Sequence, residues 1–186
     1  MEHVPLPEAV AWRGVGRCVL TSLWMLARRQ VHTPRQHVGR TIEFADGTRS
    51  RVYRETTVPR TAREPCFLVV TFRLRAVRGG GHRLFRVVSL LNTPLFVGFP
   101  GFVSKLWMAD DERGRYRGLY EWDSAALAEQ YARSLWRVLE LVSVPGSIHY
   151  EVVPGLHRDD AVTAPAAFAA GDREAPSTQQ WWRVVA

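Results

Sequence analysis

The strongest constraint on the fold is the order in which strand-like and helix-like patterns alternate along residues 66–154. Strands are expected at 66–77, 102–109, 115–122 and 147–153, which are rich in β-branched and aromatic side chains. Helices are expected at 82–91 and 124–142, where apolar residues recur at steps of three and four. The resulting order is βαββαβ. It predicts an α+β protein with a ferredoxin-like, four-stranded antiparallel sheet and both helices on one face.

This predicted core has extensions at both ends, which gives three parts: 1–65, 66–156 and 157–186. The first part is expected to hold a helix over 7–30 and a β-hairpin over 41–57. In the helix, an apolar line runs through Trp12, Val15, Val19, Leu23 and Leu26. The last part is Ala-, Asp- and Pro-rich, with little drive to fold alone. Its final Trp181-Trp182 pair is expected to dock on the chain's own core or on a dimer mate.

The predicted sheet has helices on one face only, and its other face is rich in apolar and aromatic side chains. An apolar sheet face of this size is normally covered, often by a second subunit. We therefore expect a homodimer.

The charge of the chain is high and uneven. The 186 residues carry 25 Lys and Arg against 18 Asp and Glu, a net charge of +7. Residues 1–90 hold 16 Arg and 6 acids (+10), and residues 91–186 hold 9 basic residues and 12 acids (−3). The arginines occur singly or in pairs with no basic run or nucleic-acid-binding motif, so nucleic acid is not an expected partner. The helix at 7–30 could contact an anionic membrane peripherally, although covering the core or extending the dimer is the favoured role.

The sequence shows neither a secretory signal nor a membrane span, which predicts a cytoplasmic protein. The most apolar early stretch, 15–27, has 13 residues, whereas a bilayer span needs about 20. Cys18 and Cys66 lack metal-ligand spacing and are interpreted as thiols. The six histidines show no metal-binding pattern, and Gly79-Gly80-Gly81 lacks the Lys-Ser/Thr of a phosphate loop. No metal and no cofactor are therefore expected.

Two strands of the predicted hairpin over 102–122 carry the candidate site. Lys105 and Trp107 share a face of one strand, and Gly118 and Tyr120 share a face of the next. If these faces look toward the helices, they line a pocket with an aromatic wall, one cation and one phenol. The candidate catalytic residues are Lys105, Trp107, Tyr120 and His149, and the candidate substrate-binding residues are Asn92, Phe96, Phe99, Trp122 and Tyr131.

Each of these residues also has a plain structural interpretation. The aromatic residues can be core or dimer packing, and Lys105 can extend its stem to the surface. The apolar loop over 92–100 can be a lid on a hydrophobic ligand or can pack under the N-terminal extension. His149 can act as a general base, since histidine titrates near neutral pH, or can be structural.

One motif resembles a known family. It runs Pro100-Gly101-Phe102, Lys105, Trp107, an acidic turn, Gly118-Leu119-Tyr120, and then a helix with Ala128 and Tyr131. This pattern is similar to the YdhR-like monooxygenase family of the dimeric α/β-barrel superfamily, which includes the antibiotic-biosynthesis monooxygenases. The resemblance implies a homodimer whose two sheets close into a barrel. It also implies oxidation of aromatic polyketides by O₂ without metal or flavin.

These observations lead to one main hypothesis about function and two alternatives. The main one is a small enzyme that acts on a hydrophobic aromatic or polyketide-like molecule by cofactor-independent monooxygenation. Lys105 or Asn92 would stabilise the substrate anion, and Tyr120 or His149 would handle the proton. A non-oxidative cyclase or isomerase could use the same pocket, and a non-catalytic protein could simply bind a hydrophobic ligand there.

Overall fold

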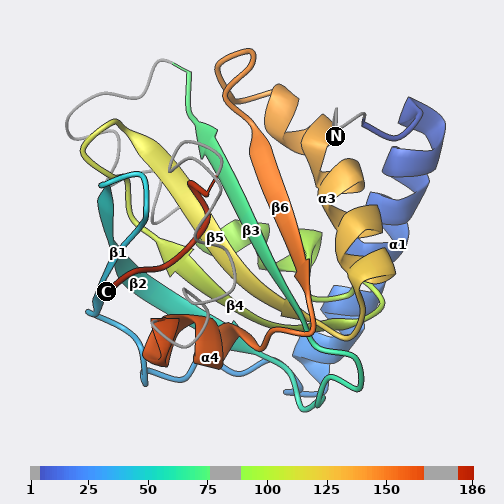
Figure 1. Cartoon of the computed structure of the whole chain (residues 1–186). Coiled ribbons are helices and arrows are strands. Elements are labelled where there is room, and N and C mark those ends of the chain that lie inside the picture. Colours follow the sequence, from blue (N-terminus) through green and yellow to red (C-terminus); the bar gives the residue numbers. More distant parts are fainter. Residues whose placement is uncertain (1–4, 76–88, 166–179) are drawn as a thin grey trace.

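A computed structural model describes residues 5–75, 89–165 and 180–186, which form one six-stranded antiparallel sheet with helices on both faces (Figure 1). The strands are β1 (Thr41–Glu43), β2 (Arg49–Thr57), β3 (Cys66–Arg73), β4 (Phe102–Met108), β5 (Arg115–Trp122) and β6 (His149–Pro154). The helices are α1 (Glu8–Ala27), the 3-10 helix η1 (Ser89–Leu95), α3 (Ala125–Glu140) and α4 (Arg158–Thr163).

The strand order is β1-β2-β4-β5-β3-β6, and every pairing is antiparallel. Within it, β5 lies between β3 and β4, and β3 lies between β5 and β6. This is the split arrangement of the ferredoxin-like fold, so the predicted fold class is confirmed. The N-terminal hairpin β1–β2 pairs with β4 and thereby lengthens the same sheet by two strands.

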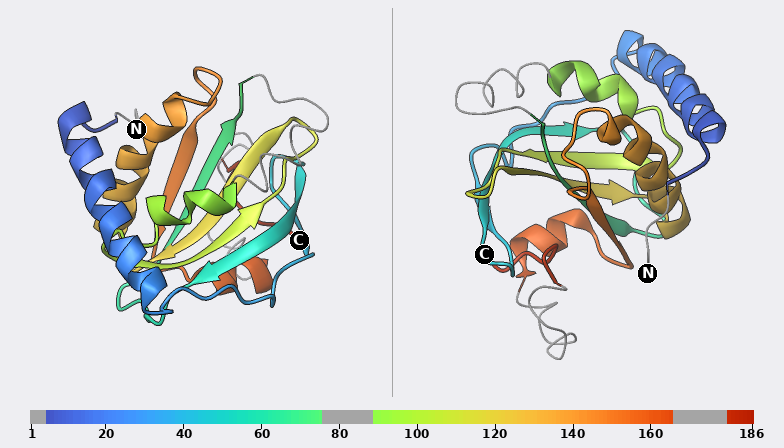
Figure 2. Two further views of the ribbon diagram at one scale, coloured as in Figure 1. Left: turned by 180° about the vertical axis from the view of Figure 1, so that it is seen from behind. Right: turned by 90° about the horizontal axis from the view of Figure 1, so that it is seen from above.

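The first face of the sheet is covered by α3, η1 and α1 (Figure 2). The predicted apolar stripe of α3 packs on the strands through Tyr131, Leu135 and Leu139. This helix is capped by Ser124, whose side chain accepts a hydrogen bond from the Leu127 N–H at 3.4 Å. The preceding residue, Asp123, accepts a hydrogen bond from the backbone N–H of Arg63 at 2.6 Å. Its carboxylate thus ties the linker after β2 to the end of β5.

Helix α1 lies on η1 and α3, but with a different face from the one its apolar line predicted. Its buried residues are Ala11, Val15, Cys18 and Ser22, whereas Trp12, Leu23 and Leu26 are exposed. The Ser22 hydroxyl donates to the Pro94 carbonyl at 3.0 Å and accepts from the Gly98 N–H at 2.8 Å. Small side chains face inward because the η1 region approaches the helix backbone this closely.

Two other expectations need adjustment. Most of the helix predicted at 82–91 falls in residues 76–88, outside the described residues, and 89–91 belong to η1. The loop predicted to begin at Asn92 therefore begins inside this 3-10 helix, and Phe96 and Phe99 follow it as buried residues. The apolar character of 92–100 is explained by its burial under α1.

The second face of the sheet is covered by the same chain, where we expected a partner subunit. Helix α4 and the C-terminal residues pack on Phe67, Leu106 and Leu119, each 0% exposed (Figures 1 and 2). The C-terminal segment pairs with β1, where the Glu43 N–H donates to the Ala186 carbonyl at 2.7 Å. The Trp181-Trp182 segment therefore docks on its own chain. A homodimer stays a prediction. The apolar second face does not support it, because the chain itself covers that face.

Two clusters of buried charged residues join neighbouring elements of the fold. On β2, Glu55 accepts a hydrogen bond from Arg158 of α4 at 2.7 Å and contacts His37 at 3.2 Å. A second cluster joins the β1–β2 turn to the β4–β5 hairpin. In it, Arg117 of β5 contacts Asp111 at 3.0 Å and Asp46 at 2.8 Å. Because an unpartnered buried charge is costly, each cluster holds its two elements in one relative position.

The contact between α1 and the η1 region predicts a large cost for Gly98→Ala. An added Cβ would lie 2.3 Å from the Cys18 carbonyl oxygen and 2.7 Å from the Ser22 nitrogen, so the helix must move. We expect unfolding free energy to fall by about 1–3 kcal/mol, measured by urea denaturation. The matched control is Gly16→Ala on the same helix, where nothing lies within 4 Å. That change should stabilise by up to about 1 kcal/mol, and equal effects of the two variants would contradict the packing described.

Candidate functional site

A cavity of about 560 Å³ lies between the first face of the sheet, α3 and η1. Its floor is formed by β4 and β5, its aromatic wall by Phe96, Tyr120 and Tyr131, and its aliphatic wall by Leu135 and Val138 of α3. Pockets of 300–1,000 Å³ with mainly apolar walls and few polar groups are typical small-molecule sites.

Strand register brings the polar and aromatic groups of the cavity together. Lys105 pairs with Tyr120, and Trp107 pairs with Gly118, across β4 and β5. Because side chains alternate between faces, all three side chains point to the first face. Gly118 leaves room for its neighbour, since a Cβ there would lie 2.6 Å from the Tyr120 ring. The Tyr120 ring therefore occupies the space that a side chain at 118 would fill.

Lys105 is buried at the floor of this cavity, 8% exposed and surrounded by aromatic rings. Its Nζ lies 3.4 Å from the centroid of the Trp107 ring, 4.5 Å from that of Phe96 and 4.8 Å from that of Tyr120. Among the residues that the structure describes, none forms a hydrogen bond or an ion pair with this nitrogen. Among the described residues, the amine therefore has no carboxylate partner.

Two effects act on the protonation of this amine. Burial, and secondarily the charge of Arg54, hold the pKa of Lys105 well below its ordinary value. The three rings favour the ammonium form, by about 0.5–2 kcal/mol for each cation–π contact. The rings offset part of the cost of burying a charge, and the net effect on the pKa of Lys105 is downward. Lys105 is thus a weakly basic amine that takes up a proton readily when an anion arrives beside it.

Tyr120 and Tyr131 form a pair of buried phenols across the cavity. The Tyr131 hydroxyl donates to the Tyr120 hydroxyl at 3.3 Å. Burial raises the pKa of both groups above the ordinary tyrosine value. Both therefore remain protonated at neutral pH. Because Tyr131 already donates its proton to Tyr120, the Tyr120 hydroxyl is the one whose proton can be donated to a ligand oxygen. Neither can serve as a base there.

The sequence analysis missed two residues of β2, Tyr53 and Arg54. The register of β2 on β4 shifts between Val52 and Arg54, which marks a β-bulge. As a result, two consecutive side chains contact Trp107: the Tyr53 ring centroid lies 6.3 Å and the Arg54 guanidinium 5.1 Å from that ring. Arg54 Nη1 is buried without a hydrogen-bond partner among the described residues. The Trp107 indole N–H is fixed by Thr56, to which it donates at 3.0 Å.

Most of the predicted site residues come together in the structure. The residues that line the cavity are Asn92, Phe96, Lys105, Trp107, Tyr120 and Tyr131. Phe99 and Trp122 lie behind the wall, with ring centroids 5.2 Å and 4.6 Å from that of Tyr131, and support it from the core. His149 does not reach the cavity. Its side chain is exposed on the other side of β6, 6.3 Å from the Trp181 ring, while Tyr150 faces α3.

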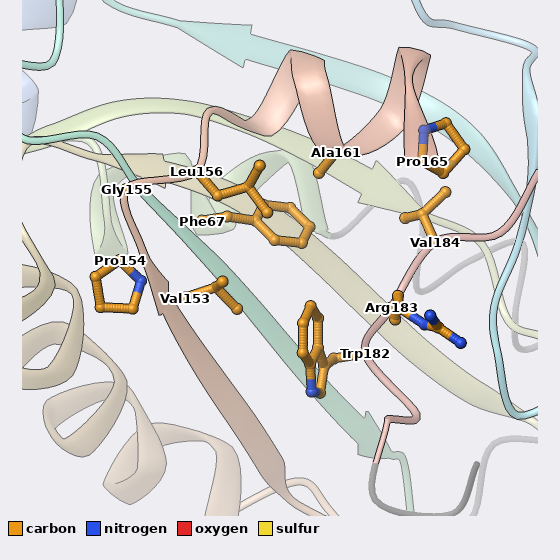
Figure 3. A pocket seen from close by; sticks show the side chains of 10 residues that line it. All are labelled: Phe67, Val153, Pro154, Gly155, Leu156, Ala161, Pro165, Trp182, Arg183 and Val184. Carbon is orange, nitrogen blue, oxygen red and sulfur yellow. The ribbon is translucent and has the colours of Figure 1, made fainter. Parts of the chain in front are cut away.

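A second cavity, of about 180 Å³, lies on the second face between β3, β6, α4 and the C-terminal segment. Phe67, Leu156, Val184 and Trp182 surround it (Figure 3). Among the described residues that line it, Arg183 is the single ionisable one. In the described part of the chain, no group of three or more His, Cys, Asp or Glu is placed to hold a metal ion. The first-face cavity, with its lysine and phenols, is therefore the candidate site.

No protein-family model matches the chain, and no curated protein matches it. Among solved structures, the chain is similar to an uncharacterised ferredoxin-fold protein from Listeria monocytogenes 4b F2365, described as related to antibiotic biosynthesis monooxygenases. The two are 13% identical with a TM-score of 0.37. The match covers 58% of this chain and 64% of that one, less than two thirds of its length. Membership of the YdhR-like family stays a prediction.

Proposed function

We propose that the protein is a small enzyme that oxygenates a hydrophobic aromatic or polyketide-like molecule with O₂ and without a cofactor. The observation that carries this proposal is the buried Lys105 at the floor of an aromatic cavity, with no carboxylate partner among the described residues. Apolar and aromatic walls favour a flat ring system as ligand. The uncompensated amine favours a ligand that becomes an anion in the site, because that anion supplies the missing partner.

In the proposed reaction, the neutral Lys105 amine takes a proton from an acidic C–H or O–H group of the substrate. The products are a substrate anion and an ammonium ion, which form an ion pair within the cavity. Water is largely excluded there, so the attraction within the pair is stronger than in bulk solvent. The site therefore stabilises the anion at the moment it forms.

The anion then reacts with O₂ directly. It gives one electron to O₂, and the resulting radical pair combines to form a carbon–oxygen bond. The peroxide takes the proton back from Lys105 and becomes a hydroperoxide. Loss of water from the hydroperoxide and the remaining C–H group leaves a carbonyl, so a CH₂ group and O₂ yield C=O and H₂O. The Tyr120 phenol donates a hydrogen bond to the oxygen that carries the negative charge, and Tyr131 holds Tyr120 in place by donating to its hydroxyl oxygen.

Oxygen uptake with an anthrone, whose ring CH₂ is acidic, tests this function. Wild-type protein should accelerate uptake above the buffer rate, and Lys105→Met should lower the catalysed rate at least 100-fold, in the range of a lost general base. Arg63→Met is the matched control, because it replaces an exposed cation outside the cavity. It should keep the wild-type rate.

Three other results would contradict this proposed function or favour one of its alternatives. Equal uptake by wild type and Lys105→Met would refute the role of Lys105. Anaerobic conversion of a polyketide-like substrate at the aerobic rate would indicate the cyclase or isomerase alternative. Tight anthrone binding without turnover would indicate a ligand-binding protein.

The position of Lys105 also makes a prediction about stability. A buried amine without a partner costs about 1–3 kcal/mol, so Lys105→Met should raise the unfolding free energy at pH 7 by that order. The native pKa lies below the unfolded value of about 10.4. Between these two values the unfolded chain binds more protons, so stability rises with pH through Lys105. Urea denaturation from pH 7 to 9.5 should show that the difference in unfolding free energy between variant and wild type becomes smaller as the pH rises. A variant less stable than wild type at pH 7 would contradict the burial cost.

A further inference from the structure

The outer face of α1 exposes large apolar side chains. Of the ten large hydrophobic residues that the described structure leaves most exposed, six belong to this helix: Val10, Trp12, Leu20, Leu23, Trp24 and Leu26. Leu20 is 70% exposed, and both tryptophans are about half exposed (46% and 52%). With 3.6 residues per turn, Trp12, Leu20 and Leu23 fall within about 80° of one another and form a stripe along the outer side of the helix. A contiguous apolar stripe of this kind on a surface usually marks an interaction site.

The same helix is strongly basic. It carries Arg13 and Arg17, and Arg28 and Arg29 follow its last residue, while Glu8 is the single acid within it. None of these four arginines forms an ion pair within the described residues. Arg28 instead lies over the Trp24 ring, with its guanidinium carbon 4.3 Å from the ring centroid. Their charge is therefore available to an external anionic partner.

We propose that α1 docks the protein on an anionic lipid bilayer, lying in the plane of the interface. Its tryptophans and leucines would enter the boundary between headgroups and acyl chains, and its arginines would contact lipid phosphates. Exposed Trp and Leu side chains beside Arg supply the two contacts of an interfacial helix, which are apolar burial and attraction to anionic lipid. No helix in the described part of the chain is long and apolar enough to cross a membrane.

A second copy of this chain fits the helix less well. A symmetric contact through the α1 stripe would bring the arginines of one helix close to those of the other without carboxylates between them. Such like-charge contacts cost free energy in an interface. An anionic bilayer instead offers both an apolar layer and a negative surface, so it matches the stripe and the arginines together.

Docking through α1 would place the candidate site close to the bilayer. Helix α1 packs directly on η1 and α3, the two elements that cover the cavity. A hydrophobic molecule dissolved in the membrane would therefore be near the site. The docking itself stands on the α1 surface alone and does not depend on the proposed reaction.

Vesicle sedimentation of the full-length protein tests the docking. We expect binding to phosphatidylcholine vesicles containing 30% phosphatidylglycerol and little binding to pure phosphatidylcholine. Raising NaCl toward 1 M shortens the screening length to about 3 Å and should release most of the protein. Arg13→Gln and Arg17→Gln should each lower the partition coefficient roughly fivefold, as expected for one basic residue near an anionic surface.

The apolar contribution is tested by the double variant Leu20→Glu, Leu23→Glu. Both side chains are exposed, so circular dichroism and urea denaturation should match wild type, while vesicle binding is lost. Val185→Glu, an exposed apolar residue outside α1, is the control and should bind as wild type does. Equal binding to neutral and anionic vesicles, or retained binding by the double variant, would overturn the proposal. A wild-type dimer in solution that the double variant breaks into monomers would assign the stripe to self-association instead.

Discussion

The structure depends on covering an apolar sheet on both faces with a single chain. Alternation sends Lys105, Trp107 and Tyr120 to the first face and Leu106 and Leu119 to the second, so neither face can be left to water. The second face is covered by α4 and the last residues of the chain. Helix α4 has only six residues and buries few apolar side chains. Its attachment therefore relies on charge, through the buried Arg158–Glu55 pair.

The first face, in contrast, contains the larger cavity with Lys105. The second face is covered by α4 and the C-terminal segment, and the register shift in β2 brings both Tyr53 and Arg54 into contact with Trp107. Aromatic rings thus surround the Lys105 amine at the floor of the cavity. A cavity beside an unpaired amine costs stability, and such a cost is typical of a site shaped by function rather than by folding.

Local periodicity was sufficient to predict the fold class and most of the candidate site. The strand period of two places Lys105 and Trp107 on the same face of β4, and the helix period of 3.6 places Tyr131 on the inner side of α3. Their presence in one cavity can therefore be predicted with little knowledge of the tertiary structure. The position of Arg54 could not be predicted, because a β-bulge depends on the register with which two strands pair. His149 was misplaced for a related reason: alternation separates it from Tyr150, but only the packing of α3 decides which of the two faces the cavity. The folding of α4 was missed because its stability comes from partners more than a hundred residues away.

Helix α1 shows where periodicity alone gives the wrong face. A helix that packs on a core normally turns its largest apolar residues inward. Here Gly98 approaches the helix backbone so closely at Cys18 and Ser22 that only small side chains fit there. The large residues are therefore turned outward, together with the arginines. Core packing explains why they are not inside, but not why they are tryptophan and leucine rather than polar residues. A surface that binds an anionic bilayer accounts for both their size and their position.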